Sequence, residues 1–488
     1  MGTSKLLVWG CCALVACSDD KPAGPFATLP LDGDFVVGVD APVHVARDRY
    51  GVAHINARSV ADAAFVQGYV MAHDRLPQMD ILRRFGAGTL SELFGALDPS
   101  VIDTDLEMRM HRMKPLATEA WAVMQNNPAD REVVELLQRF SDGVNAYAAD
   151  LKAGKWQVDA DVAVSFDPQR FVEWSPIDSL VLGRFQSFAL SWTTPIELDL
   201  TELYQKLRTT FDAAASTNAT AYARRGISRD ILRFAPVGKV ATIDGFPSLP
   251  RQALPPAAAS IRPTIAQATF DRARTAMHRG PRSGPFGAFG PHALMYPNAG
   301  SNSWAVGPAR ANGRALIAGD QHLQLPNPSV FYPTHLMIGN GDAERDADEI
   351  DVMGVTFAGI PGVILGTNGD VAWTSTTSYH DVNDLYLETI APCGTGSCVS
   401  FDGSQVPIET FTEQFRIGAL GTIIETRDVT YERVPHHGPI LPEIVDHQLV
   451  PRTANQALSV RYTGHEPTFE IRAIWKMAKA RSVEEGVA

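Results

Sequence analysis

The stretch Asn298-Ala-Gly-Ser-Asn-Ser-Trp304 lies just past the middle of the chain, where a Pro- and Gly-rich segment gives way to residues typical of a β-sheet. Residues 303–306 form one short run of this kind, and residues 315–318 form a second, apolar one. Between them stands Asn312-Gly313, the dipeptide that most strongly favours a tight turn between two antiparallel strands. We therefore predict a β-hairpin with Ser301 near the start of its first strand.

Length and composition limit the class of protein. The chain has 488 residues, of which 45% are hydrophobic and 20% are charged, and these proportions are typical of globular proteins rather than disordered or membrane-embedded ones. Its length corresponds to roughly three domains. The formal net charge of −13 disfavours nucleic acid as a partner, because binding to phosphates requires a basic surface.

The N-terminus has the features of an export signal. Lys5 precedes an apolar run over residues 6–16, which is too short to cross a bilayer as a helix. The run ends in Leu14-Val-Ala-Cys17 before polar residues, a pattern that resembles a bacterial lipobox. We expect a lipoprotein signal peptide over residues 1–16, acylation of Cys17, a tether over residues 17–32, and a periplasmic or cell-envelope location with membrane contact only through the lipid. The alternative is an ordinary signal peptide that ends near a Cys.

Two cysteines follow Cys17, namely Cys393 and Cys398, on either side of a Gly-containing loop. In an exported protein, such a pair favours a local disulfide. A metal site at these cysteines is disfavoured, because no second pair of Cys or His residues has a suitable spacing.

Helical patterns dominate the first half of the chain. Ser59-Val-Ala-Asp62 is a capping signal that opens a helix, whose apolar side chains continue at intervals of three and four residues to Met79. We expect Pro77 to kink or interrupt this helix. Further helical patterns continue to about residue 207, whereas the part from residue 301 onward contains mainly strand patterns.

A change of composition separates the two halves. Ten prolines and several glycines fall between residues 234 and 300, and such a density does not sustain a helix or a central strand. We expect residues 33–270 and 301–488 to form two structural regions, with residues 271–300 as a spacer that is removed on maturation. A plain interdomain linker is the alternative, although long structureless segments inside a domain are usually functional or removable.

Short motifs follow one another from about residue 36 to the end of the chain. They are Arg47-Asp-x-Tyr-Gly-Val-x-His-Ile55, Gly68-Tyr-x-x-Ala-x-Asp-Arg-Leu-x-Gln-Met-Asp80, Phe171-x-x-Trp-Ser-Pro-x-Asp178, Gly300-Ser-Asn-Ser-Trp304, Asp320-Gln-His-Leu323, Gly359-x-Pro-Gly362, Asn368-x-x-x-Ala-Trp-Thr374 and His437-Gly-Pro439. Each motif is weak alone. Together they resemble the penicillin amidase family of N-terminal-nucleophile hydrolases, which includes penicillin, cephalosporin and acyl-homoserine-lactone acylases.

The resemblance implies an α+β fold, the four-layer αββα sandwich of N-terminal-nucleophile hydrolases. It also implies that the precursor cuts itself between Gly300 and Ser301 and matures into an α/β heterodimer that hydrolyses N-acyl amides. The hydroxyl of Ser301 would be the nucleophile and its new α-amine the base, since an α-amine with a pKa of roughly 7.7–8.0 is partly neutral near pH 7–8. No organic cofactor is implied.

The resemblance also assigns further residues to the site by position. His322 would orient the nucleophile, and the backbone N–H of Thr377 would donate to the oxyanion; a second donor, an Asn side chain, would lie beyond residue 488. The residues implied for a structural calcium ion are Glu197, Asp381, Asn383 and Asp384, and those implied for the acyl pocket are Phe188, Trp192, Leu323 and Leu365. Apolar residues at such spacings are as often plain core as pocket.

Three functions remain open at this point. Two are enzymatic, a β-lactam side-chain acylase and a long-chain acyl-homoserine-lactone acylase, which differ in an acyl pocket whose depth the sequence does not give. The third is a non-catalytic, lipid-anchored remnant of such an acylase. It is kept open because the chain ends soon after a capping box at Ser482, so that the sequence resembles a truncated one.

Overall fold

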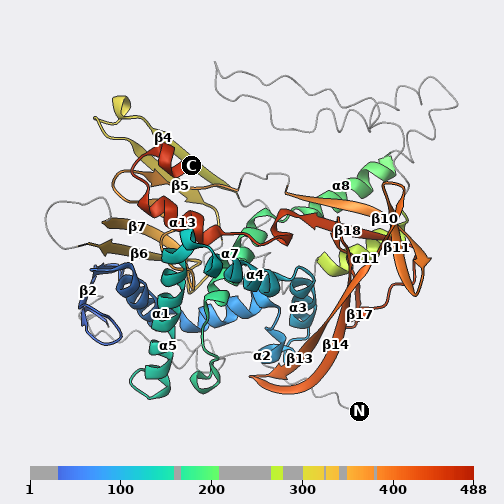
Figure 1. Cartoon of the computed structure of the whole chain (residues 1–488), viewed down its shortest axis with the longest axis horizontal. Helices are drawn as coiled ribbons and strands as arrows, with labels where there is room; N and C mark the ends of the chain where they lie inside the picture. Colours follow the sequence, from blue (N-terminus) through green and yellow to red (C-terminus); the bar gives the residue numbers. More distant parts are fainter. Residues whose placement is uncertain are drawn as a thin grey trace, which may run out of the picture.

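The computed structural model describes residues 31–158, 166–207, 265–277, 300–323, 326–339, 349–377 and 382–487. Helices dominate its first half and strands its second half, which confirms the mixed fold predicted from the sequence (Figure 1). The helices are α1 (Val60–Ala87), α2 (Ser91–Phe94), α3 (Ser100–Met110), α4 (Met113–Asn126), α5 (Arg131–Lys152), α7 (Pro176–Ser191), α8 (Thr194–Leu207), α11 (Gln267–Met277), α13 (Glu470–Lys479) and α14 (Val483–Val487). Among the residues described, no helix has the length and apolar composition needed to cross a membrane.

The strands of the described residues form five sheets. The strands are β1 (Gly33–Phe35), β2 (Val43–Arg47), β3 (Ala53–Ala57), β4 (Ser301–Val306), β5 (Leu316–Gln321), β6 (Phe331–Ile338), β7 (Ile350–Phe357), β8 (Leu365–Thr367), β9 (Ala372–Trp373), β10 (Asn383–Cys393), β11 (Gly396–Phe401), β12 (Ser404–Pro407), β13 (Glu409–Ala419), β14 (Thr422–Val434), β15 (Gly438–Pro439), β16 (Glu443–Val445), β17 (Gln448–Val450) and β18 (Gln456–Tyr462). The smaller sheets have the orders β12-β11-β10-β18, β13-β14-β15, β16-β17 and β4-β5.

The largest sheet joins the two halves of the chain. Its seven strands follow the order β1-β2-β3-β6-β7-β8-β9. β3 from the first half pairs in parallel with β6 from the second half, from Ala53 opposite Thr334 to Ala57 opposite Ile338, whereas the other neighbours are antiparallel. One continuous hydrogen-bonded sheet therefore contains strands from both sides of Gly300.

α1 begins and ends at the residues that the sequence indicates. Ser59 Oγ accepts a hydrogen bond from the backbone N–H of Asp62, and Gly88 ends the helix with a positive φ of 65°. Pro77 does not interrupt α1, so this part of our expectation is wrong. Residues on both sides of it, such as Leu76 and Met79, are fully buried, so tertiary packing outweighs the cost of one proline.

Two glycines let α1 and α5 pack closely. A Cβ atom at Gly68 of α1 would overlap the backbone carbonyl of Phe140 on α5. Similarly, a Cβ atom at Gly143 of α5 would overlap the backbone carbonyl of Phe65 on α1. Each helix thus presents a glycine where the backbone of the other comes nearest, and a side chain at either position would separate them.

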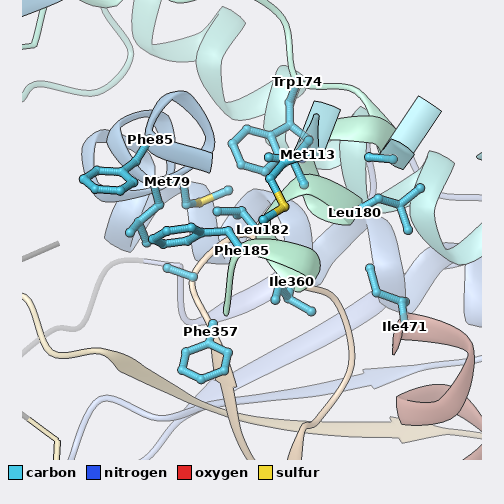
Figure 2. Close-up of a cluster of buried hydrophobic side chains, with 14 of the residues drawn as sticks. Met79, Phe85, Met113, Trp174, Leu180, Leu182, Phe185, Phe357, Ile360 and Ile471 are labelled. Carbon is cyan, nitrogen blue, oxygen red and sulfur yellow. The ribbon is translucent and has the colours of Figure 1, made fainter. Parts of the chain in front are cut away.

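The hydrophobic core combines helices of the first half with residues of the second. Figure 2 shows ten of its buried side chains, namely Met79, Phe85, Met113, Trp174, Leu180, Leu182, Phe185, Phe357, Ile360 and Ile471. The first seven come from the first half of the chain, with α1, α4 and α7 contributing six of them, and the last three come from beyond β6. Fully burying an apolar side chain of this kind contributes roughly 1.5–3 kcal/mol, so this core holds the two halves together.

β4 and β5 form the predicted hairpin, but residues 307–315, with a 3₁₀ turn over Pro308–Arg310, join them in place of a two-residue turn. Within this connection, Asn312 and Gly313 have positive φ values of 54° and 87°. In Figure 1, the β6–β7 part of the large sheet lies between the hairpin on one side and α1 and α5 on the other. Helices, large sheet and hairpin therefore follow one another in the order expected for an αββα sandwich.

A helix crosses one boundary that we placed from composition. We expected a spacer to begin at residue 271; α11 extends to Met277 and buries Phe270, Ala273 and Ala276, and which residues are removed on maturation stays a prediction. The segment Gln267–Met277 contains neither proline nor glycine, and its buried face packs against β16 and β18. Composition averaged over residues 234–300 concealed this short amphipathic helix. Residues 278–299 lie outside the described part of the chain.

Candidate active site

Ser301 is the first residue of β4 and lies opposite Gln321 on β5. Because side chains alternate between the two faces of a strand, Ser301 shares one face of the hairpin with Gln321. Leu323 continues this face just beyond β5. All three residues line a cavity of about 340 Å³.

The cavity is mainly apolar. Helices α7 and α13 form one part of its wall, and the chain that follows β7 and β9 forms another. Its apolar lining includes Leu190, Leu323, Phe357, Ile360, Leu365 and Ile474. A cavity of this size with apolar walls and a few polar groups is typical of a site for a small molecule. Phe357 and Ile360 also belong to the core in Figure 2, so the cavity borders well-packed structure.

A short segment after β9 brings Thr377 to the cavity. The side chain of Gln321 holds this segment against β5, because its Nε2 donates to Thr374 Oγ1 at 3.1 Å and to Ser375 O at 2.8 Å. The close approach also depends on Gly319, where a Cβ atom would overlap Thr374 Oγ1. We did not predict Gln321 as a site residue, although the register of the hairpin and the alternation of strands place it on the cavity face.

Gly300 and His322 lie next to each other at the open end of the hairpin. The carbonyl oxygen of Gly300 accepts a hydrogen bond from the backbone N–H of His322 at 2.9 Å. The ring of His322 contacts Asp320 Oδ2 at 2.9 Å and Asn302 Nδ2 at 3.2 Å through its Nε2. These contacts place the ring on the face opposite Ser301, and the role of His322 in orienting the nucleophile stays a prediction. Strand alternation explains this placement of the ring, since it puts consecutive residues on opposite faces.

Of the four residues expected in the acyl pocket, Leu323 and Leu365 line the cavity, whereas Phe188 and Trp192 do not. Phe188 and Trp192 belong to a buried aromatic cluster around His111, with ring centroids 4.6 and 4.7 Å from its ring. Their assignment to the pocket is therefore corrected: both side chains contribute to the core behind α7.

The geometry of α7 explains this correction. The side of α7 that faces the cavity carries Gly183, Gln186, Ser187, Leu190 and Ser191, which follow the three- and four-residue intervals of one helical face. Phe188 and Trp192 each lie one position further along, which is roughly 100° around the helix axis. Because apolar residues occur on both faces of α7, the sequence did not show which face meets the cavity.

The aromatic cluster contains two histidines with lowered pKa values. His111 Nδ1 lies 3.0 Å from His465 Nε2, and the two rings stack. Burial lowers the pKa of His111 well below its ordinary value, and burial together with nearby arginines lowers the pKa of His465 to about 3. Both rings are therefore neutral near pH 7, and neither lines the cavity beside Ser301.

The residues implied for calcium come together only in part. Asn383 Nδ2 donates to Glu197 Oε1 at 2.8 Å, so β10 and α8 meet at these side chains. Asp384 follows Asn383 on β10 and is exposed on the opposite face, and Asp381 lies outside the described residues. Calcium takes roughly six to eight oxygen ligands. The part of the chain that the structure describes has no group of three or more His, Cys, Asp or Glu side chains placed to hold a metal.

The two predicted cysteine features have different outcomes. Cys393 and Cys398 form a disulfide between the end of β10 and β11, with their Cα atoms 5.7 Å apart. This bond closes the short turn that the sequence places between the two cysteines. Cys17, the expected lipid attachment site, lies outside the described residues.

The structure therefore has the local features that the sequence resemblance implies: a mixed fold, and a serine at the first position of a strand, directly after glycine and beside an apolar cavity. The comparison with known families agrees with this resemblance. The model of the family described as penicillin amidase matches residues 42–488, and the chain belongs to this family.

Relatives of the chain include acylases with two kinds of name. The chain is 27% identical over 464 residues to the acyl-homoserine lactone acylase QuiP of Pseudomonas syringae pv. syringae, covering 94% of this chain and 48% of that protein. It is 27% identical over 432 residues to the penicillin acylase 2 proenzyme of Pseudomonas sp. strain SE83, covering 88% and 47%. It is 24% identical over 371 residues to the penicillin G acylase of Escherichia coli, covering 72% and 40%. The chain thus spans about half the length of these curated relatives.

Proposed function

We propose that the protein is a self-processing acylase that hydrolyses the amide bond of N-acyl compounds, with Ser301 as its nucleophile. One observation carries this proposal: Ser301 and Thr377 line the same mainly apolar cavity. The proposed site thus combines a hydroxyl, a candidate oxyanion donor and a surface that suits an acyl chain. The names of the relatives, which are acylases, support the same reaction.

Self-processing would begin with attack of Ser301 Oγ on the carbonyl carbon of Gly300. Negative charge then develops on the carbonyl oxygen, and the backbone N–H of His322 already donates to this oxygen at 2.9 Å. Donors at such distances stabilise an oxyanion. The C–N bond breaks as the nitrogen of Ser301 takes up a proton, and water then hydrolyses the resulting ester. The products are a new carboxylate at Gly300 and a free α-amine at Ser301.

The acylase reaction would then use this α-amine as the base. It takes the proton from Ser301 Oγ while the oxygen attacks the substrate carbonyl, and it passes the proton to the leaving amine. Thr377 N–H would donate to the oxyanion, and the apolar cavity would hold the acyl chain. Water then attacks the acyl-Ser301 ester and releases the acid.

Two substrate classes follow from the names of the relatives, namely acyl-homoserine lactones and penicillins. Both are N-acyl amides, and in both the acyl group would occupy the cavity. The apolar walls formed by α7, α13 and the chain after β7 suit an alkyl or an aryl group alike. The proposal therefore extends to the class of N-acyl amides.

Three further features belong to the proposal. The mature protein would be an α/β heterodimer of one precursor, and a lipid at Cys17 would anchor it in the periplasm or cell envelope. A calcium ion would stabilise the junction of α8 and β10, where Glu197 and Asn383 meet. This ion would act on stability alone and take no part in the reaction.

Intact-mass analysis and N-terminal sequencing of the purified chain would test the proposal. The wild type is expected to yield a fragment that begins Ser-Asn-Ser-Trp and to hydrolyse N-acyl-homoserine lactones or penicillins. Ser301→Ala should remain one chain without activity, whereas Ser303→Ala, two residues along the same strand, should be cut normally. A single uncut and inactive wild-type chain would instead support the alternative of a non-catalytic, lipid-anchored remnant.

A further inference from the structure

We propose that Gln186 selects acyl chains that carry a hydroxyl group, so that the preferred substrates are N-(hydroxyacyl) amides rather than unsubstituted ones. This inference rests on the proposed function, since it assumes that the acyl chain occupies the cavity beside Ser301. Gln186 lies on the cavity face of α7, one position from Ser187. It would act as a specificity-determining residue.

The state of the Gln186 side chain is the main observation. Only 4% of the residue is exposed, and its Oε1 is buried without a hydrogen-bond partner, so the side-chain amide must turn in the cavity wall to present this oxygen to a ligand. Leaving a buried polar atom unpaired costs roughly 1–3 kcal/mol, so a ligand that pairs with it gains more than an ordinary exposed contact. Among the polar side chains of the described cavity lining, Gln186 alone has a buried atom of this kind.

The neighbouring polar groups of the lining already have partners. Ser187 Oγ donates to Gly183 O at 3.0 Å, and Ser191 Oγ donates to Ser187 O at 2.7 Å, as is common for serine inside a helix. Gln321 holds the segment after β9 through both of its N–H bonds. These three side chains are therefore engaged by the protein, whereas Gln186 keeps a buried oxygen without a partner.

Glu470 on α13 completes the polar side of the cavity. A Cβ atom at Gly183 would lie 4.0 Å from Glu470 Cβ, so the carboxylate stands across from α7, one helical turn from Gln186. Thr468 Oγ1 donates to Glu470, and Arg184 donates to Thr468 Oγ1 at 2.7 Å. This hydrogen-bonded chain offsets the charge of Glu470 within the protein, so it does not require a cationic ligand.

A hydroxyl fits this environment better than other polar groups. It both donates and accepts, so it can pair with an amide in either orientation. A keto oxygen only accepts and would leave Oε1 of Gln186 unpaired. A carboxylate is disfavoured by Glu470, because the described lining contains this acid and no lysine, arginine or histidine. The apolar remainder of the wall suits the rest of the acyl chain.

The test compares three amides with the same homoserine-lactone amine and different acyl groups: octanoyl, 3-hydroxyoctanoyl and 8-hydroxyoctanoyl. The full-length wild type, Gln186→Leu and Gln138→Leu would be compared by kcat/KM. Gln138 is an exposed residue of α5, so its substitution is a matched control for the change of residue type. We expect the wild type to prefer at least one hydroxylated substrate by roughly threefold to tenfold in kcat/KM. Gln186→Leu should lose this preference while it still cleaves the octanoyl amide. Gln138→Leu should keep the preference of the wild type.

A wild type that shows no preference for either hydroxylated substrate would overturn the inference, as would a Gln186→Leu variant that loses activity equally on all three.

Binding to Ser301→Ala separates this inference from the proposed function and needs no change at Gln186. Calorimetry would compare octanamide with its 3-hydroxy and 8-hydroxy derivatives, which carry no carboxylate. If the wild type cleaves no N-acyl substrate but Ser301→Ala binds a hydroxy amide several-fold more tightly than octanamide, the proposed reaction fails and the selectivity of the cavity stands. Equal binding of all three amides would overturn the selectivity as well.

Discussion

Gln321→Met would test how the candidate active site is held together. Methionine has nearly the length of glutamine but lacks N–H groups, so the change removes the hydrogen bonds to Thr374 Oγ1 and Ser375 O. Each such bond contributes about 0.5–1.5 kcal/mol, and the segment after β9 thus loses roughly 1–3 kcal/mol of attachment to β5. The overall free energy of unfolding should change less, because Ser375 is exposed and water can replace the lost donor.

The expected effect on catalysis follows from the position of Thr377. If its backbone N–H stabilises the oxyanion, complete loss of the donor would lower kcat by about 10²–10³. A segment that is loosened by 1–3 kcal/mol still occupies its catalytic position for part of the time, which corresponds to a fall of roughly fivefold to a hundredfold. KM should change little, because methionine nearly keeps the length of the Gln321 side chain and the apolar walls of the cavity are unchanged.

The assay would combine intact mass, to establish that the variant has been cut before Ser301, with the kinetics of N-acyl amide hydrolysis and a thermal melt. Gln405→Met is the matched control, since Gln405 Nε2 donates to Ser400 Oγ at 3.0 Å on an exposed strand far along the sequence. A processed Gln321→Met protein whose kcat stays within about twofold of the wild type would refute the positioning role of Gln321.

Three further perturbations give separate tests. Gly319→Ala should displace Thr374 and reduce turnover while the fold persists, and Gly307→Ala, whose Cβ would meet nothing nearby, should behave as wild type in the same kinetic assay. Glu107→Gln should stabilise the protein increasingly as pH rises, because burial raises the pKa of Glu107 from 4.5 to about 8 in the folded protein. Between these pH values the wild type keeps the proton of Glu107 when folded and releases it when unfolded. The wild type therefore loses stability over this range, by roughly 3 kcal/mol at pH 7. Urea melts of both proteins at pH 5, 7 and 9 would check this, and parallel curves would contradict it. Chelation of calcium with EGTA should lower the melting temperature of the wild type but not that of Asn383→Ala. If the wild type melts at the same temperature with and without EGTA, the result would argue against the calcium site.

Local sequence patterns predicted the hairpin that carries Ser301, but not its register. The pairing of Val306 with Leu316 leaves residues 307–315 to join the strands, whereas a two-residue turn at Asn312-Gly313 would have set a different register, and the register determines which residues share the face of Ser301. The register implied by a two-residue turn would have put His322 on the face of Ser301; the observed register differs from it by an odd number of residues and puts Gln321 there instead. The helix caps at Ser59 and Gly88 were predictable, since each depends on a few consecutive residues.

Long-range packing was not accessible in this way. The parallel pairing of β3 with β6 joins residues nearly three hundred positions apart, and no local pattern specifies it. The choice between Gln186 and Phe188 as a cavity residue depends on which face of α7 meets α13 and β5, and α7 is buried on both sides. Pro77 was misjudged because the cost of a proline within a helix is set against packing that the sequence does not display.

The contacts between the two halves explain how the protein would keep its site after a cut before Ser301. The side chain of Gln67 on α1 donates to Gly362 O at 3.1 Å and accepts from Gly362 N at 3.0 Å, and all of these groups are buried. Trp475 Nε1 donates to Glu132 Oε1 at 2.7 Å, which ties α13 to α5. These bonds, like the β3–β6 pairing, do not depend on the peptide bond that is cut. The cavity itself takes one wall from α7 and another from β5 and α13, so cleavage would free the amine of Ser301 without separating it from the surface that selects the acyl chain.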